Sequence, residues 1–114
     1  MKFKEWPPGE GLMRKVDDAG LVIEGCYSNG VDSALLYAEN LTENFFDLSS
    51  GEAGAILQKL RTYRIRIAVV YNPANVRFSS RFGEMAAEEG RVGYFKLFES
   101  DQAAREWLNR PQEG

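Results

Sequence analysis

The sequence predicts a small α/β domain in which helices alternate with the strands of a mainly parallel sheet. Segments with apolar residues four positions apart, the spacing of one helix face, alternate with short apolar runs typical of strands. The clearest of these runs is Ile65–Tyr71, whose β-branched residues indicate a strand buried on both faces. The 114 residues are enough for one domain. Strands joined by helices make right-handed crossovers, which place the strands in parallel.

The first residues predict one short strand. Lys2–Trp6 is expected to form an edge strand, which Pro7-Pro8-Gly9 ends because proline cannot donate to a sheet. We therefore expect residues 1–16 to form an N-terminal arm or edge strand. Residues 17–110 are expected to form a single α/β domain.

The other elements follow from caps and apolar spacing. The first helix is predicted from Asp17 or Asp18 to about Tyr27, because Asn29-Gly30 supplies a left-handed residue that stops it. The later elements are predicted, in chain order, as a strand at Asp32–Ala38, a helix at Ser50–Tyr63, a strand at Ile65–Tyr71, a helix from Ser79 or Ser80 to Gly90, a strand at Tyr94–Phe98 and a helix capped by Ser100 or Asp101.

The three strands Ala34–Ala38, Ile65–Val70 and Tyr94–Phe98 are expected to be adjacent, with Ile67 and Val69 near the centre of the core. Parallel strands need cover on both faces, and three short strands make a thin sheet. Residues 1–16 or a second subunit should therefore supply additional cover.

Charge is separated along the chain. Residues 16–58 carry eight acidic and no basic residues, whereas residues 59–83 carry six basic and no acidic ones. The two segments form either solvated faces that neutralise each other within one molecule, or complementary surfaces that meet between subunits or at a partner. Together with the thin sheet, this separation predicts a homo-oligomer, most simply a dimer, and an unidentified protein partner.

The composition excludes several kinds of catalytic site. The chain has no histidine and its only cysteine is Cys26, so Ser-His-Asp catalysis, Cys-His catalysis and Cys/His zinc sites are excluded. No intrachain disulfide can form, which is typical of a reducing cytoplasm. No span approaches the roughly 20 apolar residues of a membrane helix. We therefore expect a cytoplasmic, non-enzymatic protein with no metal, no cofactor and a buried thiol at Cys26.

One basic and aromatic cluster raises the possibility of nucleic-acid binding. Arg61, Arg64 and Arg66 lie close in sequence to Tyr63. The isoelectric point near 5.0 and the adjacent acidic segment argue against this function, so nucleic acid is not an expected partner.

Residues 39–70 read ENLTENFFDLSSGEAGAILQKLRTYRIRIAVV. This run resembles the core of a bacterial family of domains of unknown function, FFDL-x-[ST]-G-x-AG-x-ILQK, and the resemblance extends weakly from about Asp17 to Leu108. That family resembles STAS domains, the fold of anti-sigma-factor antagonists, so the resemblance implies a STAS-like sandwich over residues 17–110. STAS proteins carry Asp-Ser-Ser-Gly at a helix start, where this chain carries Leu48-Ser49-Ser50-Gly51.

The resemblance makes Ser49 and Ser50 candidate phosphorylation sites. Ser49 and Glu52 also fit a capping box, in which the serine hydroxyl accepts from a first-turn N–H and the glutamate returns to the cap N–H. The positive end of the helix dipole favours a phosphate, but Asp47 and Glu52 repel one. The sequence leaves both roles open.

Two classes of function remain. In a regulatory or protein-interaction module, the loop 39–50 and the following helix contact a partner. In a ligand-binding domain, a small molecule lies between loops 45–50 and 72–78, at the carboxyl ends of adjacent strands. The residues that bear on this choice are Phe45, Phe46, Asp47, Tyr71 and Phe78. A deep pocket lined by Phe46, Tyr71 and Phe78 favours the ligand, whereas a filled surface with Ser49 exposed favours the partner.

Overall fold

The computed structural model describes residues 2–9 and 11–110. Strands and helices alternate along the chain as β1 (Lys4–Glu5), α1 (Ala19–Ser28), β2 (Ser33–Tyr37), α2 (Glu52–Thr62), β3 (Arg66–Val70), α3 (Ser80–Val92), β4 (Phe95–Phe98) and α4 (Asp101–Asn109). Three short 3-10 turns lie at Val16–Asp18, Ala38–Asn40 and Leu48–Ser50.

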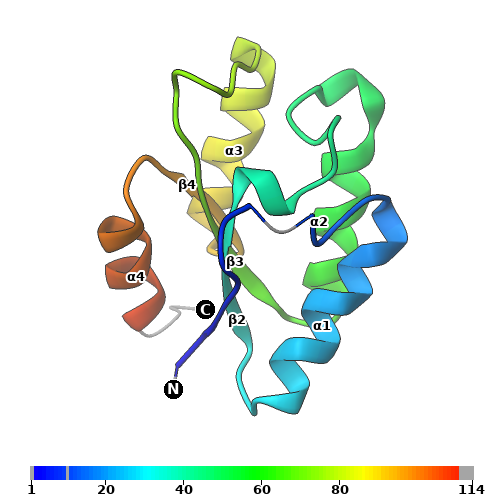
Figure 1. The fold of residues 1–114 in the computed structure, drawn as a ribbon. Helices are drawn as coiled ribbons and strands as arrows, with labels where there is room; N and C mark the ends of the chain where they lie inside the picture. The colour runs from blue at the N-terminus through cyan, green and yellow to red at the C-terminus, as the bar shows by residue number, and fades with distance from the viewer. Residues whose placement is uncertain (1, 10, 111–114) are drawn as a thin grey trace.

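The four strands form one parallel sheet in the order β1-β2-β3-β4, which is also their order in the chain (Figure 1). The predicted α/β class, with a parallel sheet and alternating helices, is confirmed. The predicted adjacency of the strands around residues 34–38, 65–70 and 94–98 is confirmed as well. This arrangement is compatible with a STAS-like fold.

Strand order explains how the helices are distributed. Right-handed crossovers that always step in the same direction place every connecting helix on the same face of the sheet. Accordingly, α1, α2 and α3 pack on one face, and α4, which follows the last strand, lies on the other (Figure 1). The three-helix face buries sheet residues Ala34, Leu36, Ile67, Val69 and Phe95, and the α4 face buries Leu35, Ala68 and Val70. Ile67 and Val69 are fully buried, as predicted.

Arg66 fastens the end of α4 to the sheet. Its side chain is only 6% exposed, and Nη2 donates to the carbonyl oxygens of Leu108 (2.7 Å), Arg110 (3.3 Å) and Trp107 (3.4 Å). The guanidinium lies 4.7 Å from the centre of the Trp107 ring. A cation at the carboxyl end of a helix is favourable because the helix dipole is negative there. Burial lowers the pKa of Arg66.

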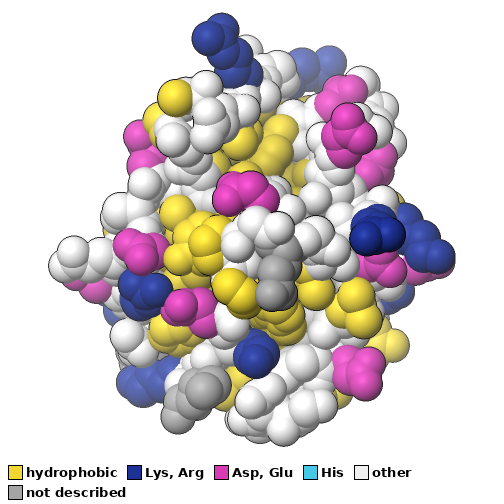
Figure 2. Space-filling view, viewed as in Figure 1, with side chains coloured by type: hydrophobic (Ala, Val, Ile, Leu, Met, Phe, Trp, Pro, Cys, Tyr) yellow, Lys and Arg dark blue, Asp and Glu magenta, His cyan; other side chains and the backbone are white. Residues whose placement is uncertain are grey.

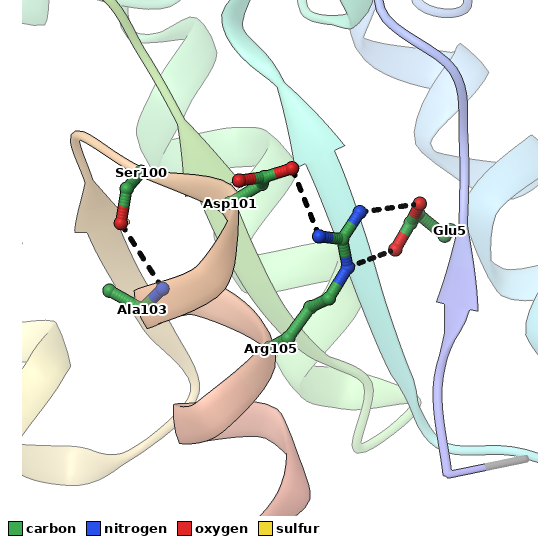
Figure 3. Close-up of polar contacts among 5 residues, drawn as sticks. All are labelled: Glu5, Ser100, Asp101, Ala103 and Arg105. Atoms are coloured by element: carbon green, nitrogen blue, oxygen red, sulfur yellow. Dashed lines mark hydrogen bonds and ion pairs between the residues drawn. The ribbon is translucent and has the colours of Figure 1, made fainter.

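The other half of α4 is held by Arg105 (Figure 3). Its guanidinium makes a two-point contact with the Glu5 carboxylate of β1, with Nε–Oε1 and Nη2–Oε2 distances of 2.9 and 3.0 Å. Nη1 also donates to Asp101 at 2.9 Å, while the Ser100 hydroxyl caps α4 by accepting from the N–H of Ala103. The hydrogen bond to Glu5 is the largest influence raising the pKa of Arg105. These contacts join the first strand to the last described helix.

Two helix boundaries differ from the prediction because of where the left-handed glycines lie. The helix expected to end at Gly90 continues to Val92 and ends at Gly93, which has φ of 98°. The helix expected to begin at Ser50 begins at Glu52, because Gly51 has φ of 76° and forms its cap. Gly51 therefore serves backbone conformation, and no atom lies within 4 Å of where its Cβ would be.

The prediction of a homo-oligomer loses part of its sequence-based support. The thin-sheet argument required added cover, and the chain supplies it. β1 pairs with the edge of β2, α4 covers one face of the sheet, and β3 is buried along its whole length. The basic segment is also partly used within the molecule, because Arg66 binds the end of α4 and Arg61 pairs with Glu89 of α3. The dimer stays a prediction.

The contact between α1 and Trp6, the residue that follows β1, provides a test of this packing. A methyl group at Gly25 would lie 2.6 Å from Cζ2 of the buried Trp6 ring, so Gly25→Ala forces the indole to move. We expect a loss of about 1–3 kcal/mol in unfolding free energy, measured by urea denaturation. Gly20→Ala in the same helix is the matched control. No atom lies within 4 Å of the added carbon there, so it should stabilise by up to about 1 kcal/mol. Equal effects of the two substitutions would contradict this account.

Candidate functional site

The candidate site lies at the carboxyl ends of β2 and β3, between the loop 38–50 and the loop 71–79. Figure 2 shows the surface hollowed between these two loops, with hydrophobic side chains visible on the floor. Acidic side chains lie below and to the right of the hollow, and basic side chains lie above it. Both loops leave the carboxyl edge of the sheet, the first toward α2 and the second toward α3, and these two helices lie on the same face.

Asn40 holds the first loop in place. The buried side chain accepts the N–H of Tyr37 at 2.7 Å and donates from Nδ2 to the carbonyl oxygen of Pro7 at 3.0 Å. Its own carbonyl oxygen accepts the N–H of Met13 at 2.8 Å. One residue thus ties the end of β2 to two parts of the N-terminal segment. The sequence did not predict this role, because Pro7 and Met13 lie about 30 residues away from Asn40.

The predicted aromatic residues form one connected cluster. Phe45 is fully buried and packs edge-on against Phe46, with ring centres 5.2 Å apart. Phe46 stacks on Phe78 across the two loops at 6.1 Å and 21°, and Tyr71 meets Phe78 at 5.8 Å. Phe46, Tyr71 and Phe78 are half-buried at the surface. The three rings fill the space between the loops with one another, so they do not line a deep pocket.

The turn 47–52 differs from the predicted capping box. Asp47 is the residue that caps it, because Oδ1 accepts from the N–H of Ser49 at 3.1 Å and from the Ser49 hydroxyl at 2.6 Å. The N–H of Glu52 donates to Ser50 Oγ at 3.2 Å, and the Glu52 carboxylate accepts from Asn44 instead of returning to Ser49. The capping-box prediction is therefore wrong: the chain enters a 3-10 turn first, which moves the helix start beyond both serines.

The two candidate serines have different surroundings, although both are exposed. Ser50 Oγ lies within hydrogen-bond distance of the carbonyl oxygens of Asn44 (2.9 Å) and Asp47 (2.8 Å), besides accepting from Glu52. Ser49 Oγ contacts only the Asp47 carboxylate among the described residues. The Ser50 hydroxyl thus has three hydrogen-bonding neighbours in the turn, whereas the Ser49 hydroxyl has one.

Two shallow hollows flank Phe46. The first, of about 440 Å³, lies between residues 38–46 and 75–77, and the second, of about 420 Å³, lies between residues 43–48 and 77–79. Glu43, Phe46 and Arg77 line both of them. Among the described residues, Glu39, Glu43 and Arg77 make no ion pair or side-chain hydrogen bond, so their charges face solvent.

Two tyrosines near the site have raised pKa values, and burial is the main cause in both. Burial raises the pKa of Tyr71, and the Glu99 carboxylate raises it further. Tyr37 at the end of β2 also has a raised pKa, caused first by burial and then by the carboxylates of Asp101 and Glu5. Both phenols therefore stay protonated at neutral pH and can act as hydrogen-bond donors.

Cys26 is remote from this site. It is fully buried in α1, its thiol donates to the carbonyl oxygen of Ser33 at 3.5 Å, and burial raises its pKa to about 11. The thiolate form is the nucleophile, so this thiol is unreactive near neutral pH. Among residues 2–9 and 11–110, no group of three or more Asp, Glu or Cys side chains could hold a metal ion. None of the helices in the same residues is long and apolar enough to cross a membrane.

The chain matches a known protein family over most of its length. Residues 2–108 match the model of the family described as "Domain of unknown function (DUF4180)". The chain belongs to this family. No curated protein and no solved structure matches it significantly. The match includes β1 and α4. Arg66 and Arg105, which hold α4 against the sheet, therefore both lie in the part of the chain that the family model covers.

The turn 47–52 yields a second test of the structure. Ser50→Ala removes the acceptor for the N–H of Glu52 and the hydroxyl that joins two carbonyl groups, so unfolding free energy should fall by about 1 kcal/mol. Ser49→Ala is the matched control and should cost less, because the Ser49 N–H keeps its bond to Asp47. Denaturation of both variants decides the question, and a larger loss for Ser49→Ala would restore the capping box.

Proposed function

We propose that this protein is a non-enzymatic regulatory or protein-interaction module that recognises its partner with the loop 39–50 and the first turns of α2. The observation that carries the proposal is the stacking of Phe46 on Phe78, with Tyr71 against Phe78. These rings fill the space between the two loops and form a continuous surface there. Ser49 is exposed on the same loop as Phe46.

The chemistry of this surface supports binding over catalysis. Glu43, Asp47 and Arg77 are exposed around the half-buried Phe46 and Phe78. Aromatic anchors surrounded by charged groups are typical of protein interfaces, where the aromatics supply affinity and the charges select the partner. The chain has no histidine and its one thiol is buried, which leaves it without an imidazole general base and without a reactive thiol nucleophile.

A capture experiment with matched surface variants tests this proposal. Ala55 is exposed in the first turns of α2, so Ala55→Arg should abolish partner binding without affecting the fold. Gln102→Arg introduces the same side chain at an exposed position of α4, on the opposite face of the sheet, and should bind normally. Cross-linked partners from the native cell are identified by mass spectrometry and then tested in purified form. A partner retained equally by both variants, or no partner for the unaltered protein, would disprove the proposal.

Phosphorylation of Ser49 is the proposed switch. A phosphate on this hydroxyl would replace the hydrogen-bond donor that lies 2.6 Å from the Asp47 carboxylate with a group of about −1.5 to −2 charges. Repulsion from Asp47 would then open the 3-10 turn Leu48–Ser50 and move the loop that contacts the partner. The switch would therefore act through Asp47, which lies outside α2.

A double-mutant cycle tests the proposed switch. Ser49→Asp should lower the melting temperature more than Ser49→Ala, because two carboxylates would meet at one turn. Asp47→Asn keeps an acceptor oxygen and removes the charge, so it should abolish most of that difference. Phosphopeptide analysis of the native protein should find the phosphate on Ser49 and not on Ser50. The switch would be ruled out if the effects of the Ser49 and Asp47 substitutions on the melting temperature simply add, or if the native protein carries no phosphate on Ser49.

A further inference from the structure

A groove runs between α1 and α2, which lie side by side on the three-helix face of the sheet (Figure 1). The residues that shape it are Gly20, Ile23, Glu24 and Tyr27 of α1, with Lys59 and Tyr63 at the end of α2. It has a volume of about 450 Å³, and no described residue of the loops 38–50 and 71–79 lines it. At Gly20 the wall has no side chain, and no atom lies within 4 Å of where a Cβ would be. The groove is therefore open and separate from the candidate site.

Two exposed tyrosines lie at one end of this groove, where both helices end. Tyr27 is 58% and Tyr63 is 47% exposed, and their rings meet edge-on with centres 6.4 Å apart. The Tyr27 hydroxyl donates to the carbonyl oxygen of Tyr63 at 3.4 Å, which joins the two walls. Among the described residues four large hydrophobic side chains are exposed, and three of them, Leu21, Tyr27 and Tyr63, belong to α1 or to the end of α2. Exposed apolar groups gathered on one surface indicate an interaction site.

The two walls of the groove carry opposite charges at the same level. Glu24 precedes Tyr27 by three residues on α1, and Lys59 precedes Tyr63 by four residues on α2, so each charge lies one helical turn before the tyrosine of its own wall. The two helices run in the same direction, because each connects two strands of a parallel sheet. Among the described residues, the side chains of Glu24 and Lys59 make no ion pair. One acid and one base therefore face each other's wall without a partner.

We propose that this groove is the interface of a symmetric dimer, in which it packs against the same groove of a second copy of the chain. In such an interface the same patch is used by both subunits, so it must be complementary to itself. A two-fold axis along the groove places α1 of each copy on α2 of the other. Glu24 then pairs with Lys59 of the partner subunit, and Tyr27 packs on Tyr63 of the partner subunit. Symmetry makes each of these contacts twice.

The pattern of charges is the reason for choosing a second copy as the occupant. An acid and a base on opposite walls at one level are the groups that the two-fold axis brings together. The argument does not use the thin sheet or the separation of charge along the chain, which supported the dimer in the sequence. It is also independent of the proposed function, because Lys59 and Tyr63 lie at the end of α2, away from its first turns and from the loop 39–50.

The test measures the mass of the purified full chain by analytical ultracentrifugation over a range of micromolar concentrations. The unaltered protein should reach twice the 12.9 kDa of one chain. Glu24→Lys and Lys59→Glu each place like charges at both symmetric contacts, so each alone should raise the dissociation constant of the dimer by about tenfold or more. Tyr27→Ser, which removes an exposed ring, should weaken the dimer without any change of charge. Thermal melting verifies that each variant is folded.

Mixing the two charge variants distinguishes a contact between subunits from one within a chain. In a mixed dimer of Glu24→Lys with Lys59→Glu, an acid meets a base at both contacts, so the equimolar mixture should dimerise as well as the unaltered protein. A contact within one chain cannot be restored by mixing. Glu84→Lys makes the same charge change at an exposed position of α3, outside the groove, and should leave the dimer intact. The proposal is overturned if the unaltered chain is a monomer at every concentration, if the mixture stays monomeric, or if Glu84→Lys weakens the dimer as much as Glu24→Lys.

Discussion

Strands β2 and β3 must be covered on both faces, and one of those faces is covered by a helix of only nine residues. Most of the molecule lies on the other side, where three helices share one large core with the sheet. On the α4 side, the helix contributes only Ala104, Leu108 and the partly buried Trp107 to the core, so specific contacts are needed to fix its position. Arg66 supplies one at the carboxyl end of the helix, and Arg105 supplies another to the edge strand.

These two arginines differ from the charged residues of the candidate site, because their charges are used to hold the fold together. Arg66 is buried against backbone carbonyl groups and the Trp107 ring, and Arg105 is engaged by two carboxylates. Charges with such partners are not available to a ligand. Arg77, Glu39 and Glu43 have no such partners among the described residues and lie together beside the exposed aromatics. The chemistry of the site therefore depends on residues that the fold itself does not use.

The strands could be predicted from the sequence because their signal is local. Apolar runs such as the one around Ile67 identify a buried strand wherever its neighbours lie. The turn at 47–52 could not be predicted, because either Ser49 or Ser50 could accept the N–H of Glu52, and only the backbone path decides that Ser50 does. The same limit explains why Arg66 was assigned to a basic surface. Arg66 is the first residue of a buried strand, and the carbonyl groups that stabilise it lie more than 40 residues further along the chain.

The candidate site shows a similar division. Phe45 and Phe46 are adjacent and chemically identical in sequence, yet one is a core residue and the other reaches the surface, because successive side chains in the turn point in different directions. The burial of Thr42 and Asn40 could not be predicted, for a different reason. A polar residue that becomes buried carries no periodic pattern, so its role depends on whether the fold provides it with a partner, as it does for Asn40 and not for Thr42.

Glu5 and Arg105 are 100 residues apart in the chain, and their contact has a consequence for synthesis on the ribosome. The first strand emerges early, but the helix that holds it and covers its sheet emerges after every other described element. Until then, a nascent chain with β2 and β3 already paired carries Leu35, Ala68 and Val70 on an open face. Domains generally fold as units during translation, so a cell has to shield this apolar face for as long as α4 is still in the exit tunnel.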